Sequence, residues 1–404
     1  MSRTAHDRVS ARSSRVWLTP EQCRLSDFVA ELNAQTTLAD YPLAQKIESN
    51  VLVYDGDSAR AAALTPATRK ALLAEWAEAL MQGPGIIVLS KAFADVAPVD
   101  EATRVFQSLI QAQQLAGTGG SDHFAKPGAN DRIWNALEKL CLYDPAVFAA
   151  YYSNDIIAMV SEAWLGVDYQ ITSQVNVVNP GGAAQSAHRD YHLGFQTPEK
   201  MARFPAHVHR LSPALTLQGA VAHCDMPVET GPTLYLPYSQ RYEPGYLAMG
   251  NPVFSDYFDH HHVQLPLTKG DAVFFNPALF HAAGHNRSKD VRRMANLLQV
   301  SSAYGRAMES VDRTRMSAAL YPALRALLAN GRLTAGGCAN AIAACAQGYA
   351  FPTNLDRNPP VGGLAPQSQQ DLMHQAIHEA WQDDIFGDAL KRQAWCNLTG
   401  EENP

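Results

Sequence analysis

The sequence predicts an α+β fold in which a core of short β-strands, arranged as a sandwich or jelly roll, is flanked by N- and C-terminal helices. Three observations support this prediction. Apolar residues recur at helical spacing through most of the first 165 residues. Short apolar runs of strand length follow from Tyr169 to Ser302, separated by turns rich in glycine and proline. Helical spacing then returns beyond about residue 306.

The composition is that of an ordinary globular protein and excludes several classes. The 404 residues are 47% hydrophobic and 18% charged, which argues against disorder, collagen and coiled coil. A net charge of -7 leaves no basic excess for a nucleic-acid partner. No uncharged apolar run approaches about 18 residues, so we expect no membrane span. The six cysteines form no CxxC pair and no secretory segment is present, so we expect free thiols in a cytoplasmic protein.

The first part of the chain is predicted to be mostly helical. Residues 1–16 are expected to form a flexible arm, with a transit peptide as the alternative because of their arginines and serines. Residues 17–305 are expected to form the main domain. Its predicted helices begin at the capping box Thr19-Pro20-Glu21-Gln22 and at Thr65-Pro66, and others occupy about 100–115 and 132–165, with a break near Asp144-Pro145. An apolar strand is predicted from Ile86 to Leu89, after the Gly83-Pro84-Gly85 turn.

The strand region and the tail follow. The predicted strands are 169–178, 214–223, 233–237, 263–267, 272–275 and 294–302. Residues 306–404 are expected to form a helical extension, with a last helix that opens at Ser368 and its capping partner Asp371. The loop from Phe351 to Gln367 is either a lid or a segment that packs on the core. Homo-oligomerisation through the C-terminal helices is left open.

A His-x-Asp pattern provides the main indication of chemistry. Residues two apart in a strand point to the same side, so His188 and Asp190 can face one metal ion. A further histidine from a distant strand would complete a 2-His-1-carboxylate site, which leaves open positions on iron. A second His-x-Asp, His223 and Asp225, precedes Met226-Pro227, so we interpret Asp225 as a turn residue. The distal candidate is His281, whose alternative is a hydrogen-bonded core histidine.

An ordered set of motifs resembles the phytanoyl-CoA dioxygenase family of iron- and 2-oxoglutarate-dependent oxygenases. The set consists of His188-x-Asp190, the run Gly231 to Pro237, Lys269-Gly270-Asp271, and His281 with Asn286 and Arg292 after it. The resemblance covers about Ser173 to Tyr304 and implies a double-stranded β-helix (jelly-roll) core in a catalytic domain. It also implies that His188, Asp190 and His281 bind Fe(II).

The same resemblance implies a residue that binds the cosubstrate. Family members use an arginine eleven residues beyond the distal histidine to hold 2-oxoglutarate, which selects Arg292 here. An arginine suits this role because its planar guanidinium can bind a carboxylate with two hydrogen bonds. Arg293 is the competitor, and it would face the opposite side of a strand. Asn176 and, less strongly, Gln218 are candidates for cosubstrate contacts, with structural amides as the alternative.

Basic residues after the metal motif suggest substrate contacts. Arg189, His192 and Arg203 are the candidates, supported by His207, His209 and Arg210, and they favour an anionic substrate, with a solvated loop as the alternative. The stretch from Thr197 to Ser212 is longer than in compact family members. His260-His261-His262 resembles a metal tract but lacks an acidic or cysteine partner, so we expect a solvated loop.

The predicted function is an Fe(II)- and 2-oxoglutarate-dependent dioxygenase that uses O2 to hydroxylate an aliphatic C–H of a small metabolite. Asp190 argues against a halogenase, because family halogenases carry a small residue there. Desaturation, epimerisation and cyclisation would use the same ligands and stay open. Two further alternatives are a jelly-roll metalloprotein with chemistry independent of 2-oxoglutarate and a catalytically degenerate member that binds a ligand.

Overall fold

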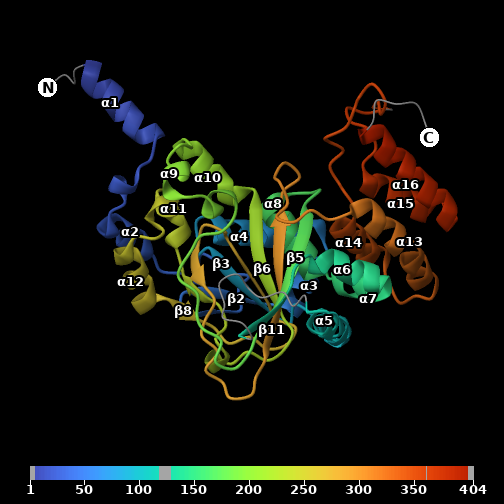
Figure 1. Cartoon of the computed structure of the whole chain (residues 1–404), viewed down its shortest axis with the longest axis horizontal. Coiled ribbons are helices and arrows are strands. Elements are labelled where there is room, and N and C mark those ends of the chain that lie inside the picture. Colours follow the sequence, from blue (N-terminus) through green and yellow to red (C-terminus); the bar gives the residue numbers. More distant parts are fainter. Residues whose placement is uncertain (1–4, 118–128, 361, 399–404) are drawn as a thin grey trace. The chain divides into compact units, whose positions relative to one another are not determined.

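The computed structural model describes residues 5–117, 129–360 and 362–398, whose elements are labelled in Figure 1. The chain forms two compact units. One consists of Met1–Ala94, Ser121–Asp131 and Asn176–Leu297, and the other of Asp95–Gly120, Arg132–Val175 and Leu298–Pro404. The second unit therefore combines the C-terminal helices with helices from the middle of the chain, a grouping that the sequence did not predict.

The N-terminal helices of the first unit begin where the capping patterns predicted. The Thr19 amide donates to Gln22 Oε1 at 2.8 Å, closing a capping box on η1 (Pro20–Gln22), and α2 (Leu25–Leu32) follows. The Thr65 side chain caps α4 (Pro66–Met81), and α3 (Gly56–Ala62) precedes it. The predicted flexible arm instead includes α1 (Ala5–Val16), while residues 1–4 lie outside the described part of the chain.

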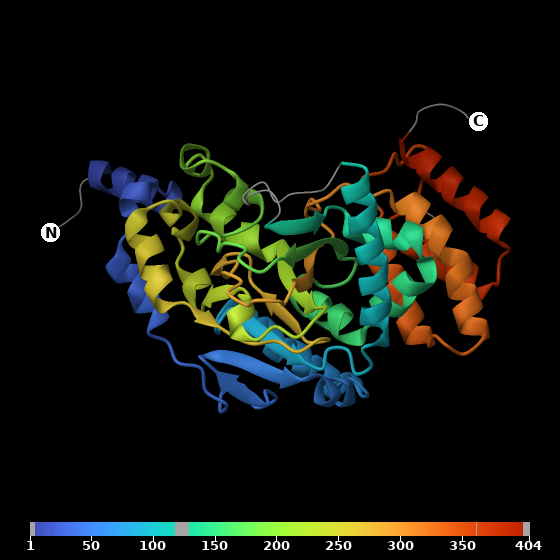
Figure 2. The same cartoon turned by 60° about the horizontal axis from the view of Figure 1, so that its bottom comes forward.

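A large mixed sheet forms most of the β structure. Its strand order is β1-β2-β3-β9-β6-β11-β5-β4. β2 and β3 are parallel, and β9 lies antiparallel to both β3 and β6. Figure 2 shows β1 and β2 in blue at one edge of this sheet. The bounds are β1 (Lys46–Glu48), β2 (Val51–Asp55), β3 (Ile86–Ser90), β4 (Asn130–Ile133), β5 (Gln170–Val178), β6 (Thr216–Ala222), β9 (Ala272–Phe275) and β11 (Arg293–Ser301).

A smaller antiparallel sheet positions the distal histidine. It has the order β10-β7-β8, from β10 (Phe280–Ala282), β7 (Leu234–Leu236) and β8 (Val263–Gln264). Alternate residues of these strands serve two cores, as the pleat of a strand requires. Tyr235 packs inward with Val88, Val273 and other residues of the large sheet. The two sheets therefore face each other, which confirms the predicted α+β class with its sandwiched β core.

The outer face of the small sheet is covered by helices of the same unit. Leu236 and Phe280 pack there with Phe28 of α2 and with Phe254 of α12 (Pro252–His261). Asn251 caps α12 and Pro252 occupies its first turn, a helix start that was not predicted from the sequence. The expected loop at His260-His261-His262 is therefore wrong in part. His260 and His261 are exposed, as expected, but they end a helix.

The described part of the second unit is helical beyond its strand segments. Asp144 caps α7, which confirms the predicted break at Asp144-Pro145, and Ser368 and Asp371 form the predicted capping box. Thr353 and Asn358 in the loop before Ser368 hydrogen-bond Asn397. No helix among the described residues is long and apolar enough to cross a membrane. The helices are α5 (Ala97–Leu115), α6 (Ala136–Tyr143), α7 (Pro145–Tyr152), α8 (Asp155–Leu165), α13 (Arg313–Ala329), α14 (Ala335–Cys345), α15 (Gln369–His378) and α16 (Asp383–Leu398).

Candidate metal centre

His188 and His281 are brought together by backbone pairing. The His188 amide donates to the His281 carbonyl at 3.0 Å, and the His281 amide donates to the His188 carbonyl at 3.2 Å. Residues directly opposite each other in an antiparallel pair project to the same side. His188 thus extends the small sheet beyond β10, and both imidazoles point to the inner face, with ring centroids 4.4 Å apart.

The two imidazoles are oriented with one nitrogen available for a metal. His188 Nδ1 lies 2.9 Å from the Ser186 carbonyl oxygen, and His281 Nδ1 lies 2.8 Å from that of Leu279. A carbonyl oxygen only accepts, so each Nδ1 carries the proton in the neutral ring and each Nε2 keeps its lone pair. This is the arrangement that fixes ring orientation and tautomer in histidine metal ligands.

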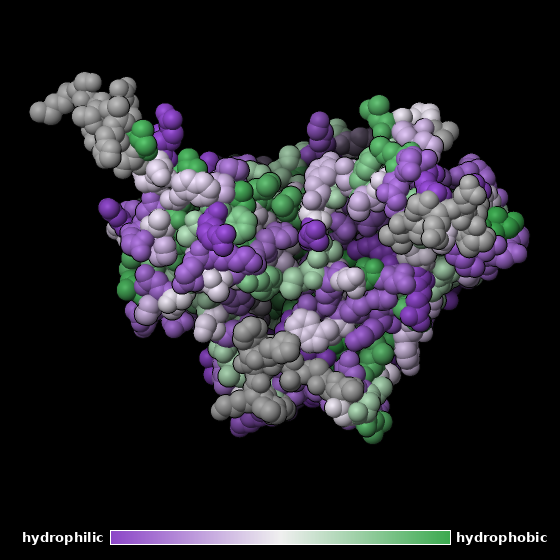
Figure 3. All heavy atoms as spheres, turned by 45° about the horizontal axis from the view of Figure 1, so that its top comes forward, coloured by the Kyte–Doolittle hydropathy of each residue, from purple (hydrophilic) through white to green (hydrophobic). Residues whose placement is uncertain are grey.

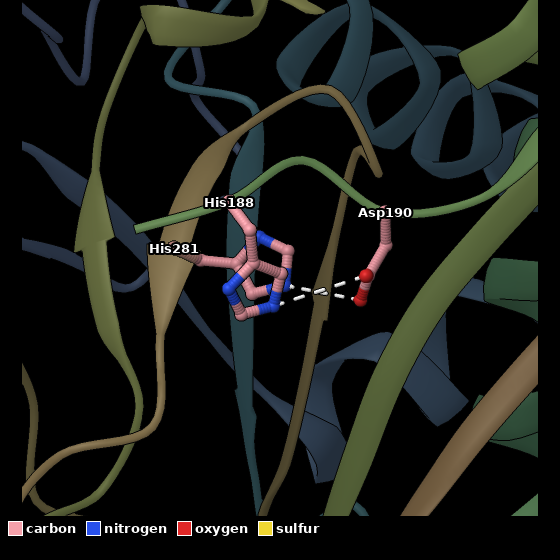
Figure 4. A group of neighbouring side chains, drawn as sticks. All are labelled: His188, Asp190 and His281. Atoms are coloured by element: carbon pink, nitrogen blue, oxygen red, sulfur yellow. Dashed lines mark ion pairs between the residues drawn. The ribbon is translucent and has the colours of Figure 1, made fainter. Parts of the chain in front are cut away.

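Asp190 supplies a carboxylate on the same side, as Figure 4 shows. Its oxygens lie 3.8 Å from His188 Nε2 and 3.3 Å from His281 Nε2. One ligand atom from each of the three residues lies within 4.8 Å of the others. Two imidazole nitrogens and one carboxylate in one cluster match the donor set of a non-haem iron site with open positions. The structure therefore brings together the three residues that the sequence predicted.

The surroundings keep Asp190 ionised. Burial alone would raise its pKa, but the Nε2–H and positive charge that His281 and His188 carry when protonated, together with the Gln218 amide, hold this pKa below its usual range. Gln218 lies on β6 and donates from Nε2 to Asp190 Oδ2. Its contact is thus with a member of the candidate metal cluster, and its Oε1 is buried without a hydrogen-bond partner among the described residues. The position of this amide among mainly apolar residues of the strand was the signal in the sequence for a polar contact of this kind.

Arg189, between the two ligands, points the opposite way. Its side chain is 2% exposed, and its Nη2 donates to the carbonyls of Ser239 at 2.5 Å and Tyr242 at 3.0 Å. The guanidinium carbon lies 5.1 Å from the centroids of both the Tyr246 and Phe280 rings. Burial lowers the pKa of Arg189 to about 10, so it stays charged at neutral pH. The structure thus places this predicted substrate contact in the protein interior, where it anchors the ligand segment.

The second His-x-Asp takes part in a turn. Asp225 Oδ1 accepts from the Lys269 amide at 2.9 Å, and Met226 bridges to Leu267. Neither His223 nor Asp225 belongs to a metal-ligand cluster in the described part of the chain. The interpretation of Asp225 as a turn residue therefore agrees with the structure.

The two neighbouring arginines have opposite environments. Arg292 precedes β11, its side chain is 59% exposed, and it donates to Asp131 at 2.9 Å and to Asn179 at 3.0 Å. Arg293 is the first residue of β11 and is 7% exposed. Burial lowers the pKa of Arg293 to about 10, and no carboxylate pairs with it among the described residues.

Arg293 lies on the side of β11 that faces the space between the sheets. Ala295 and Leu297, two and four residues further along, pack against the same core as Tyr235 and Phe275. The Phe275 ring contacts that of His281, with centroids 4.7 Å apart, and Tyr235 is the direct strand partner of His281. The buried guanidinium therefore shares an interior with the metal cluster, whereas Arg292 is engaged at the surface.

The other residues predicted to contact cosubstrate or substrate do not form one open cluster. Asn176 on β5 is 9% exposed, and its Oδ1 lacks a hydrogen-bond partner among the described residues, so its cosubstrate role stays a prediction. His192 is half-buried and forms a hydrogen bond of 3.2 Å with the Thr216 hydroxyl. Arg203 is exposed. Arg210 pairs with Glu243, and His209 is buried against the Met201 carbonyl, so neither joins an open basic cluster.

Comparison with known proteins identifies a family. The model of the family described as phytanoyl-CoA dioxygenase matches residues 64–294, more than half of the chain and all three clustered ligands. No curated protein matches the chain.

Solved structures show partial similarity. The alpha-ketoglutarate-dependent carbocyclase SnoK from nogalamycin biosynthesis is 20% identical, with a TM-score of 0.42 over 60% of this chain and 88% of that one. The alpha-ketoglutarate-dependent epimerase SnoN from nogalamycin biosynthesis is 18% identical, with a TM-score of 0.38 over 59% of this chain and 85% of that one.

Proposed function

Because the chain belongs to the phytanoyl-CoA dioxygenase family and is an iron- and 2-oxoglutarate-dependent oxygenase, we propose that it hydroxylates an aliphatic C–H bond of a small metabolite. Iron and 2-oxoglutarate together supply the oxidation of this bond by O2, with release of succinate and CO2. His188, Asp190 and His281 would hold the metal. Asp190 provides the carboxylate that supports hydroxylation over halogenation.

We further propose that the buried guanidinium of Arg293 binds 2-oxoglutarate. A buried cation without a carboxylate partner is costly, and a bound dicarboxylate would offset that cost. Arg293 meets this description and Arg292 does not, because Arg292 already pairs with Asp131 at the surface. We therefore assign the distal carboxylate of 2-oxoglutarate to Arg293, one residue beyond the position that family spacing selected.

Arg293→Lys is expected to weaken 2-oxoglutarate binding by about 30-fold or more. The substitution keeps the charge but loses the planar fork, and disrupting a buried charged pair typically costs about 2 to 5 kcal/mol. Binding is measured under anaerobic conditions by titrating 2-oxoglutarate into the Fe(II)-loaded protein and following the visible charge-transfer band.

Arg292→Lys is the matched control, and it should change the 2-oxoglutarate affinity by less than about threefold, because exposed ion pairs contribute little. A large effect confined to Arg292→Lys would return the assignment to Arg292. No effect from either variant would contradict binding of the cosubstrate by this pair of arginines.

Two exposed cations support an anionic substrate. Lys200 and Arg203 lie in the segment after the metal ligands, and neither pairs with a carboxylate among the described residues. Such charges raise the local concentration of an anion and its association rate, and salt weakens the effect.

Arg203→Ala is expected to lower kcat/KM for the active substrate by about two- to fivefold, the usual scale for a rim charge. The substrate is found by screening metabolites for stimulated succinate release, and kcat/KM is then measured at low and high salt. Arg104→Ala, on the exposed surface of α5, is the control. A neutral substrate with turnover insensitive to salt and to Arg203→Ala would refute the anionic assignment.

A further inference from the structure

The segment that follows the metal ligand Asp190 encloses an apolar pocket. It folds as η2 (His192–Phe195), α9 (Pro198–Met201) and α10 (Ala206–Ala214). These elements surround a cavity of about 260 Å³, whose apolar walls are Leu193, Phe204, Val208, Leu211 and Leu215. Figure 3 brings this side of the molecule forward and shows green hydrophobic side chains among purple ones over the area of α9 and α10.

The pocket leaves apolar surface exposed to water. Leu211, one of its walls, is 50% exposed, and the nearby Phe195 is 54% exposed. Covering apolar surface is favourable in water, so the pocket favours an apolar occupant. A cavity of about 150 Å³ is enough for benzene. The volume here therefore suits a larger group, on the order of a bicyclic ring or a branched alkyl chain.

The pocket is continuous with the metal centre along the chain. Immediately after Asp190, Tyr191 and His192 adopt positive φ angles of 61° and 47°, which are rare for residues other than glycine. Strained backbone of this kind persists where the surroundings require it, often at binding sites. The two residues turn the chain so that His192, two residues after a metal ligand, lines the pocket.

A second connection runs through β6. His192 bonds to Thr216, and Thr216 shares its face of the strand with Gln218, which donates to Asp190. Thr216 and Gln218 are two residues apart on β6, about 7 Å along the strand, and they contact His192 of the pocket and Asp190 respectively. His192 of the pocket and Asp190 of the metal cluster therefore contact neighbouring positions on one face of β6.

We propose that this pocket binds the apolar part of the molecule that the enzyme oxidises, a compact hydrocarbon group of about bicyclic size. This inference rests on the proposed function, because it takes the clustered ligands to be the oxidising centre. On this proposal, the segment that contains α9 and α10 selects the substrate by its shape and hydrophobicity. The charged end of the substrate would lie at the edge of the pocket, near Lys200, which also lines it, and Arg203.

The test is direct binding of 2-naphthol, a neutral bicyclic probe, to the full chain without iron or 2-oxoglutarate, followed by its fluorescence. Val208→Phe adds a ring to the pocket wall and should weaken binding by at least about tenfold. Val253→Phe, the same change at an exposed position on α12, is the matched control and should leave the affinity unchanged. Thermal melting of both variants reports whether they fold.

A gain of binding provides a second, independent readout. Phe204→Ala enlarges the pocket and should improve the affinity of the bulkier probe 1-pyrenemethanol by at least about tenfold relative to wild type. Equal losses of 2-naphthol binding in Val208→Phe and Val253→Phe, or no binding by the wild type, would overturn the inference. Because these measurements need no turnover, they stay interpretable if the wild type fails to convert 2-oxoglutarate to succinate, which would instead refute the proposed function.

Discussion

Asp190→Ala is expected to reduce Fe(II) affinity by at least about 100-fold and to abolish turnover. Loss of a supporting residue around a metal already costs about 10- to 100-fold, and Asp190 is the only carboxylate in the described ligand cluster. The two remaining imidazoles would present a neutral donor pair. Affinity is measured by anaerobic Fe(II) titration, and turnover by succinate release in the presence of 2-oxoglutarate.

Asp225→Ala is the matched control, because this aspartate has the same His-x-Asp context but accepts a hydrogen bond from Lys269 in a turn. It should keep the wild-type iron affinity. If Asp225→Ala lost iron while Asp190→Ala retained it, the metal centre would be at the other pair.

Arg189→Met is expected to lower the free energy of unfolding by about 2 to 6 kcal/mol. The change leaves two buried carbonyl oxygens, those of Ser239 and Tyr242, without their donor, at about 1 to 3 kcal/mol each. It also removes the cation–π contacts of the guanidinium with the Tyr246 and Phe280 rings. The measurement is urea unfolding of the full chain without metal.

Arg210→Met provides the comparison, since the Arg210 side chain is 70% exposed and pairs with Glu243 at the surface. Exposed ion pairs contribute about 0 to 1 kcal/mol, so this variant should unfold close to wild type. Equal stability of Arg189→Met and Arg210→Met would mean that Arg189 does not anchor the ligand segment.

The clustering of His188 and Asp190 could be predicted from the sequence because the constraint on their side chains is local. Spacing of two residues places His188 and Asp190 on one side of an extended segment, whatever the rest of the fold. Local spacing was not enough to identify His281, because its strand has only three residues and therefore no recognisable alternation of apolar and polar positions. The order of motifs, and not the strand itself, identified it.

The facing of the two arginines could not be predicted in the same way. A shift of one residue in the pairing register of β11 would exchange which of Arg292 and Arg293 points inward. The burial of Arg189 could not be predicted from the sequence either, because charged residues are rarely buried. The carbonyls that accept its hydrogen bonds, those of Ser239 and Tyr242, also lie about fifty residues further along the chain. Both outcomes depend on tertiary packing.

The opposed directions of Arg189 and its two neighbours limit how this segment can change in evolution. Insertion or deletion of one residue between the bridge at His188 and Asp190 would bring a cation toward the metal and a ligand into the aromatic core. Variation in the segment is therefore restricted to substitution at constant length. The segment that contains α9 and α10 begins after Asp190, so a change in its length does not alter the spacing between His188 and Asp190. Loops of different length can be grafted there while the ligand geometry is inherited unchanged.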